Sequence, residues 1–145
     1  NAVLPDCLRI RQCRALEDGF PALMSLAAGS RYLIRFPQSA ESDRAAAGFE
    51  AFMALEHYTA ARRTKSGENP CDIRPFVTGG ELRKVEDGWE IALETVATAA
   101  GSLKPSLWLD CLRTFTEAGE FPHVIYRTAI LARKPDGTLV PMEEV

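Results

Sequence analysis

The chain has 145 residues, of which 46% are hydrophobic and 26% are charged, and its formal net charge is −3. This charge excludes a global electrostatic attraction to nucleic acid or to an anionic membrane, although it is compatible with local basic patches. No apolar run reaches the roughly 18 residues that a membrane-spanning helix requires. Length and composition therefore predict one soluble globular domain of ordinary size.

The first residues indicate where the expected domain begins. Residues 1–2, Asn and Ala, resemble the remnant of a cleaved expression tag, and no initiator Met follows them. We therefore assign residues 3–145 to a single α+β domain and expect it to be a fragment of a longer protein.

The four cysteines are spaced unlike a metal or redox motif. No two of them are separated by two intervening residues, as in the C-x-x-C pairs of zinc knuckles and thioredoxin-type redox sites. Cys7 and Cys13 would point to the same face of one strand, so a bridge along that strand is unfavourable. We expect four free thiols in a reducing, cytoplasmic compartment, with Cys111 as a small core residue.

The first third of the chain predicts a strand, a short helix and a second strand. Apolar and polar residues alternate over 7–15, which is typical of a half-buried strand. Pro21 suits the first turn of a helix over 21–28, and Gly29 suits the position after its end. The apolar and aromatic run over 31–36 indicates a strand that Pro37 ends.

The middle of the chain predicts a helix and two extended segments. Ser42-Asp43 is expected to cap a helix that runs to about Glu56, with Ala45, Phe49, Phe52 and Met53 on its apolar face. A strand is expected over 58–65 and a loop over 66–70. Residues 72–77 are expected to start extended, since Arg74 precedes a proline.

The strongest local pattern is a hairpin. Strands over 81–85 and 89–98 flank Glu86-Asp87-Gly88, which predicts an Asp-Gly turn. Residues of the second strand alternate, and the core-facing set is expected to be Trp89, Ile91, Leu93 and Thr95.

The last third predicts a helix and a second hairpin. Pro105 suits the first turn of a helix with an apolar stripe made by Leu107, Trp108, Cys111, Leu112 and Phe115. A strand is expected over 124–132, and Pro135-Asp136-Gly137 turns the chain into a strand over 138–140. Pro141 limits this last strand to a sheet edge.

The order of these elements predicts the fold class. From Arg31 it reads strand, helix, strand, hairpin, helix, strand, which fits an α+β, ferredoxin-like (split βαβ) arrangement. We expect a mainly antiparallel sheet with the helices on one face. The other face would then be free for a partner.

The sequence offers no recognisable catalytic or metal-binding set. The two histidines, His57 and His123, fall at element junctions, where a surface role is the simpler interpretation. Short His and Cys spacings for a metal and glycine-rich phosphate loops do not occur. We therefore assign no catalytic, cofactor-binding or metal-binding residue.

Basic residues around the predicted loop form the candidate binding set. Arg62, Arg63 and Lys65 precede the loop and Arg74 follows it. One interpretation is a solvated rim with glutamate partners, and the other is a site for phosphate, another anion or RNA. The interleaved aromatics of an RNA-recognition motif are absent, which weakens the RNA interpretation.

Two further charged positions have a structural interpretation. Asp72 lies two residues before Arg74, so it either caps a turn or orients the arginine. Arg127 lies inside an apolar strand and needs a partner, for which Asp72 and Glu94 are candidates. Such an ion pair would be weak evidence for function.

Three short motifs together resemble a known family. They are Asp72-Ile73-Arg74-Pro75, Gly101-Ser102-Leu103-Lys104-Pro105 and Arg127-Thr128. With the opening Leu4-Pro5-Asp6-Cys7-Leu8-Arg9-Ile10, they resemble the C-terminal part of the uncharacterised bacterial radical SAM-linked domain. The resemblance covers nearly the whole chain and marks Asp72, Arg74, Pro75, Lys104, Pro105 and Arg127 as its structural motif residues.

The resemblance implies a context rather than an activity. That domain is fused to, or encoded beside, radical SAM proteins and in some cases an RNase E/G-type ribonuclease. The radical SAM cysteine triad CxxxCxxC is absent from this chain. An iron–sulfur cluster and S-adenosylmethionine are therefore expected only in the associated radical SAM domain.

Three functional hypotheses follow. The leading one is a non-catalytic accessory domain that helps a radical SAM protein to bind or position its substrate, with structured RNA as one candidate. The second is a protein-interaction or structural domain that packs on the radical SAM core through its open sheet face. The third, an enzyme in its own right, would need a pocket of polar groups around Asp72, Arg74 or Arg127.

Overall fold

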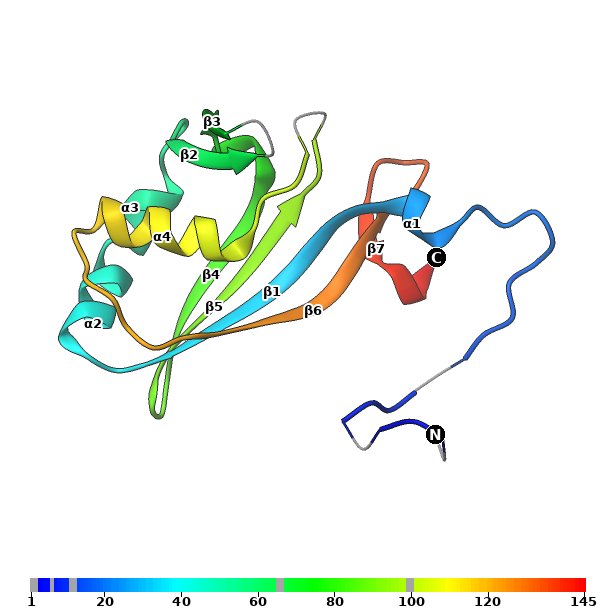
Figure 1. The fold of residues 1–145 in the computed structure, drawn as a ribbon, viewed down its shortest axis with the longest axis horizontal. Coiled ribbons are helices and arrows are strands. Elements are labelled where there is room, and N and C mark those ends of the chain that lie inside the picture. The colour runs from blue at the N-terminus through cyan, green and yellow to red at the C-terminus, as the bar shows by residue number, and fades with distance from the viewer. Residues whose placement is uncertain (1–2, 6, 11–12, 65–66, 99–100) are drawn as a thin grey trace.

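A computed structural model describes residues 3–5, 7–10, 13–64, 67–98 and 101–145 of the chain (Figure 1). It is a mixed α/β structure with a mainly antiparallel, curled sheet and few helices. The N-terminal segment leads away from the sheet, whereas the C-terminus lies beside β7 (Figure 1). The predicted tag remnant at residues 1–2 lies outside the described residues.

The main sheet has five strands within the described residues, in the order β4-β5-β1-β6-β7, and every pairing is antiparallel. Its strands are β1 (Ala27–Pro37), β4 (Val77–Val85), β5 (Gly88–Val96), β6 (Val124–Arg133) and β7 (Leu139–Pro141). In the centre, Ile34 of β1 lies opposite Ile91 of β5 and Ile125 of β6. This register places the apolar positions of three strands on one face.

Within the described residues the helices are α1 (Leu23–Leu26), α2 (Ala40–Ala47), α3 (Phe49–Met53) and α4 (Pro105–Phe115), with short 3₁₀ turns η1 (Arg74–Phe76) and η2 (Met142–Glu144). Of these four α-helices, α2, α3 and α4 carry the buried residues and pack on that apolar face, whereas α1 has no buried residue and lies at the start of β1. Figure 1 shows α2, α3 and α4 along one side of the sheet, beside a two-stranded ribbon of β2 (Thr59–Thr64) and β3 (Gly67–Asp72).

The core lies between the helices and the sheet. Its largest fully buried side chain is Trp108 of α4, whose ring contacts Phe49 and Phe52 of α3 edge-on at 6.2 and 5.7 Å between centroids. On the sheet side, Ile34 of β1 and Ile91 of β5 belong to the same core. Burial of this apolar surface is the main force that holds the helices on the sheet.

Several predicted elements are confirmed. The hairpin forms as β4 and β5, and Ile91, Leu93 and Thr95 face the core as expected. Pro105 begins α4, with Trp108, Cys111 and Leu112 buried. The strand expected over 124–132 forms as β6, and β7 lies at the sheet edge as Pro141 requires.

Three local predictions are wrong. Among the described residues of 7–15 no strand forms, because most of them are exposed and lack a sheet neighbour. The helix cap is Ser39 rather than Ser42-Asp43: the Ser39 hydroxyl accepts from the Ser42 amide, and the Ser42 hydroxyl accepts from the Ser39 amide. This helix also ends at Ala47, and α3 begins after Gly48.

Two segments that were expected to be loop or extended adopt regular structure. The described part of 66–70 belongs to β3, which pairs with β2 along its length. Pro70 lacks an amide donor, but a two-stranded ribbon tolerates it because each strand has only one neighbour. Residues 74–76 form the turn η1, with Pro75 in its first positions.

Candidate functional site

The candidate site is the face of the main sheet that points away from the helices, which we call the open face. None of the described helices covers it. The register of β4, β5, β1 and β6 places alternate residues there. They are Glu81, Arg83, Val85, Glu90, Ala92, Glu94, Arg31, Leu33, Arg35, Val124, Tyr126 and Thr128.

Paired charges cross the centre of the open face. Nε of Arg35 donates to Oε2 of Glu90 at 2.6 Å, and Arg83 donates to the other oxygen of the same carboxylate. Nε of Arg31 donates to Oε2 of Glu94 at 2.8 Å. The face carries three arginines and three glutamates, so its formal charge is neutral.

The Glu90 carboxylate is the electrostatic centre of this network. Only 3% of Glu90 is exposed, because the two flanking arginine side chains cover it. The hydrogen bond from Arg35 lowers the pKa of Glu90, with a further contribution from Arg83. Glu90 therefore stays ionised at neutral pH and fixes both guanidinium groups in place.

Two hollows and three exposed apolar side chains make the open face uneven. The larger hollow has a volume of about 440 Å³ and lies between Arg35, Val85 and Tyr126. The second, of about 390 Å³, includes Leu33 and Ala92. Val85, Val124 and Tyr126 are 38%, 52% and 48% exposed and all line the larger hollow, so an apolar rim lies at one end of the charged centre.

The predicted anion-binding residues do not converge on one point. Cζ of Arg62 lies 5.8 Å from the Phe76 ring centroid, whereas Arg63 is exposed and points to the opposite side of β2. The Arg74 guanidinium donates to the carbonyls of Leu55 and Met53 at 2.7 and 2.9 Å. Lys65 lies outside the described residues.

Arg74 therefore closes the end of a helix. The carbonyls it contacts belong to the last residue of α3 and to the turn that follows, which have no helical partners. Among the described side chains, its Nη1 atom is buried without a hydrogen-bond partner. These contacts give the motif residue a structural role, and its guanidinium points into the fold.

Asp72 is a second structural residue of the motif. Its Oδ1 accepts from the Tyr58 and Arg74 amides at 3.0 and 3.1 Å, and its Oδ2 lies 2.7 Å from Nδ1 of His57. These contacts, led by the Tyr58 amide, lower the pKa of Asp72 to about 2. The expected link between Asp72 and Arg74 thus runs through the Arg74 backbone.

The remaining motif residues frame α4 and β6. Lys104 is the residue that precedes α4, and Pro105 is its first residue. Arg127 is exposed and lies opposite Tyr32 in the sheet. The ion pair expected between Arg127 and Asp72 or Glu94 is not formed, because Asp72 contacts His57 and Glu94 contacts Arg31.

Sequence reasoning missed the Glu90 network. With Trp89 and Ile91 expected to face the core, alternation predicts that Glu90 faces outward, where glutamates are ordinarily solvated. A signal was present, because Arg31 and Arg35 are spaced by four residues and so are Glu90 and Glu94. Only the register, which sets Arg35 against Glu90 and Arg31 against Glu94, turns that spacing into two ion pairs.

The described residues supply neither a disulfide nor a metal-ligand cluster to the site. All four cysteines are unpaired, as predicted, and burial raises the pKa of Cys111 to about 11. Among the described residues no three His, Cys, Asp or Glu side chains are grouped to hold a metal ion. Across the same part of the chain, no helix is long and apolar enough to cross a membrane.

The fold and the open face define a mixed α/β domain whose sheet presents a neutral, partly apolar surface. The chain belongs to an uncharacterised protein family conserved in bacteria (DUF2344), whose family model matches residues 1–105. This match includes the sheet strands from β1 to β5 and stops at the first residue of α4. No curated protein and no solved structure matches the chain.

Proposed function

We propose that this chain is a non-catalytic accessory domain that binds a protein partner through the open face. The observation that carries the proposal is the combination of an uncovered sheet face with a neutral charge and an apolar rim. A polyanion such as RNA gains affinity by neutralising phosphates with unpaired cations. Arginines already paired with glutamates offer little of that gain.

The residue types on the open face fit a protein interface. Tyrosine and arginine are enriched among the residues that carry binding energy at protein interfaces. Here Cζ of Arg35 lies 6.0 Å from the Tyr126 ring centroid, beside the 440 Å³ hollow. An anchor side chain of the partner would fill that hollow, and Val85 and Val124 would exclude water around it.

The partner we propose is a radical SAM protein. The support is the motif resemblance to the radical SAM-linked domain, together with membership of a bacterial family. The strand order β4-β5-β1-β6 also supports the ferredoxin-like, split βαβ arrangement that we propose for the core of this fold. Any iron–sulfur cluster and S-adenosylmethionine would then belong to the partner.

RNA as the substrate of the complex is a second proposal, and one feature favours it. Arg63 is exposed on the β2–β3 ribbon, away from the open face, so it is accessible while the sheet is docked. In this arrangement the open face binds the radical SAM protein and the ribbon contacts the substrate. The two contacts are testable separately.

The docking test measures binding of the chain to the radical SAM protein from the same genome by calorimetry. Tyr126→Ala should weaken the complex at least tenfold, because it removes the largest exposed side chain beside the hollow. Leu23→Ala is the matched control, since Leu23 is 44% exposed on α1, away from the open face. Equal affinities for Tyr126→Ala and the parent chain would overturn the docking proposal.

The RNA test uses fluorescence polarisation with tRNA and rRNA fragments, on the complex and on the chain alone. Phosphate contacts predict affinity that falls steeply as salt rises. Arg63→Gln should weaken that binding, whereas Arg31→Gln, a paired arginine of the open face, should not. Binding that is absent, or independent of salt, would remove RNA from the proposal.

A further inference from the structure

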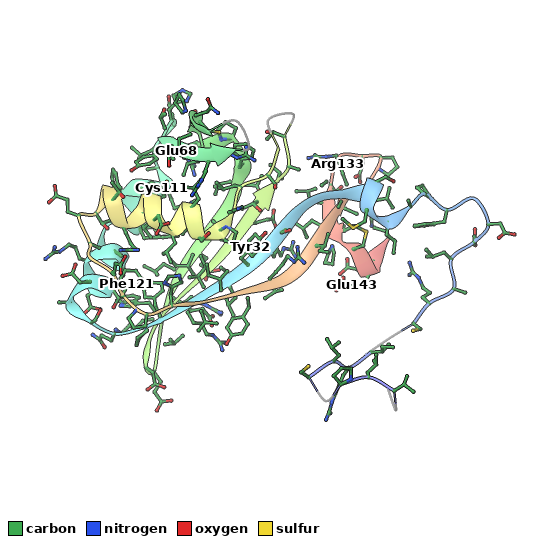
Figure 2. The ribbon with its side chains drawn as sticks, viewed as in Figure 1. Tyr32, Glu68, Cys111, Phe121, Arg133 and Glu143 are labelled. Carbon is green, nitrogen blue, oxygen red and sulfur yellow. The ribbon has the colours of Figure 1, made fainter. Side chains whose placement is uncertain are left out.

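A separate cavity lies on the helix side of the sheet, beyond the start of α4. It has a volume of about 250 Å³. Tyr32 of β1 lines it close to where α4 begins (Figure 2). Arg127 of β6 and Ser102 contribute further polar groups, and Met24, Leu103 and Ile130 contribute apolar walls. This combination of one cation, hydroxyls and apolar carbon is typical of a small-ligand site.

Arg127 is the only charged residue among the described residues that line this cavity. Across the described part of the chain, no hydrogen bond or ion pair holds its guanidinium. It lies directly opposite Tyr32 in the β1–β6 pair, so the two side chains are neighbours on the same face. A guanidinium presents several donors in a planar fork, which matches the oxygens of a carboxylate or a phosphate.

Irregular strand pairing builds the cavity wall. The β1–β6 register shifts between Arg31 and Tyr32 and again between Ala27 and Gly29. The first shift lies beside Arg127, and a bulge at this point changes the direction of the neighbouring side chains. Gly29 lies so close to β5 that an added Cβ would be 2.3 Å from the Thr95 carbonyl oxygen. A side chain at position 29 would therefore push β1 away from β5.

We propose that this cavity binds a small organic anion, with its carboxylate or phosphate group on Arg127 and its apolar part against Leu103 and Ile130. The absence of a carboxylate among the described lining residues leaves the Arg127 charge to attract the anion. The hydroxyls of Tyr32 and Ser102 supply additional donors. The volume limits the ligand to a fragment-sized molecule.

This site is independent of the docking proposal. Tyr32 and Arg127 lie on the helix side, whereas their neighbours Leu33 and Tyr126 lie on the open face. Loss of anion binding would therefore leave partner binding intact, and the failure of either proposal is visible without the other.

The experiment follows amide and arginine Nε–H signals of the isotope-labelled chain by NMR during titration with inorganic phosphate, phenyl phosphate, benzoate and neutral benzyl alcohol. We expect saturable shifts at Gly29, Ser102, Ile130 and the Arg127 Nε–H with phenyl phosphate or benzoate, and none with benzyl alcohol. Comparison of phenyl phosphate with benzoate identifies the preferred anion. If inorganic phosphate saturated the same signals with the same affinity as phenyl phosphate, the proposed contact between the ligand and the apolar walls would be wrong.

Paired variants make the result specific. Arg127→Gln should weaken the binding at least tenfold. Arg133→Gln, at the far end of the same strand (Figure 2), should leave it unchanged because Arg133 does not line the cavity. Unsaturable shifts, or equal affinities for the two variants, would overturn the site. The Arg127 Nε–H signal of the unsubstituted chain reports contact directly, so the test does not depend on how Arg127→Gln folds.

Discussion

Nε of Arg35 lies 2.6 Å from Oε2 of Glu90, across the pair of central strands β1 and β5. Arg83 of β4 contacts the other oxygen of the same carboxylate. One glutamate therefore ties three neighbouring strands together on a face that no described helix covers. This contact pairs two of the three arginines of the open face with one buried carboxylate.

Glu90→Gln should destabilise the fold. The neutral amide accepts weaker hydrogen bonds than the carboxylate, so we expect a loss of about 1 kcal/mol in the free energy of unfolding at pH 7. Urea denaturation of the two proteins measures this difference. Glu81→Gln is the matched control on the same face, because Glu81 is exposed and takes no part in this network.

The contribution of Glu90 should also depend on pH. Its pKa is lowered from the ordinary value of 4.5, so its stabilising effect is complete above that value. The effect is lost as the pH falls through the lowered pKa of the folded state. The difference between Glu90→Gln and the parent chain should therefore shrink in acid. A difference that stays constant from pH 7 to the acid range would contradict the proposed charge pairing.

Asp72 should titrate with a pKa of about 2, mainly because the Tyr58 amide donates to its carboxylate. NMR titration of the side-chain carboxyl carbon measures this value. In His57→Gln the pKa should stay below the usual 3.8, since the largest cause is the backbone donor. Stability should fall as the pH drops from 3.8 towards 2, and Asp72→Asn should remove this dependence. A normal titration midpoint in the parent chain would contradict the contacts.

Arg74→Lys should destabilise the chain by about 1–2 kcal/mol, because a single ammonium cannot reproduce the two guanidinium bonds to the Leu55 and Met53 carbonyls. Thermal or urea unfolding measures the loss. Arg63→Lys, on the exposed side of the β2–β3 ribbon, should change stability by less than about 0.5 kcal/mol. If the two variants were equally stable, Arg74 would not have the structural role described above.

Gly88→Ala should be strongly unfavourable at the tip of the β4–β5 hairpin. The added Cβ would lie 2.2 Å from the Phe36 carbonyl oxygen, which belongs to the backbone of β1 and cannot turn aside. We expect a loss of about 1–3 kcal/mol by urea denaturation. Gly79→Ala, whose Cβ would be 3.8 Å from its nearest neighbour, is the control within the same hairpin. Equal losses in both variants would mean that the close approach is unimportant.

The local patterns of the sequence were sufficient for the central hairpin and for α4. Alternation identified Ile91 and Leu93 as core residues because a strand sends successive side chains to opposite faces. Pro105 marked the start of α4 because proline has no amide donor to lose at a first turn. Both signals depend only on residues within a few positions of each other.

Local sequence patterns gave wrong predictions for one helix cap and for one strand. Ser39 and Ser42 are both able to cap a helix, and the reciprocal bonds between them settle the choice in favour of Ser39. Alternation over 7–15 predicted a strand, but a strand needs a second strand to pair with, and the described residues there belong to neither sheet. Local pattern alone cannot supply that second strand.

The sequence by itself determined the mixed α/β class and the antiparallel hairpin. Tertiary structure alone decided the role of each charged residue. Glu90 became the buried centre of the open face because the register sets it between Arg35 and Arg83. Arg127 came to face Tyr32 and a cavity because β6 pairs with β1 through a bulge. Charge interactions decay with distance in space rather than along the chain, so only the folded structure fixes these partners.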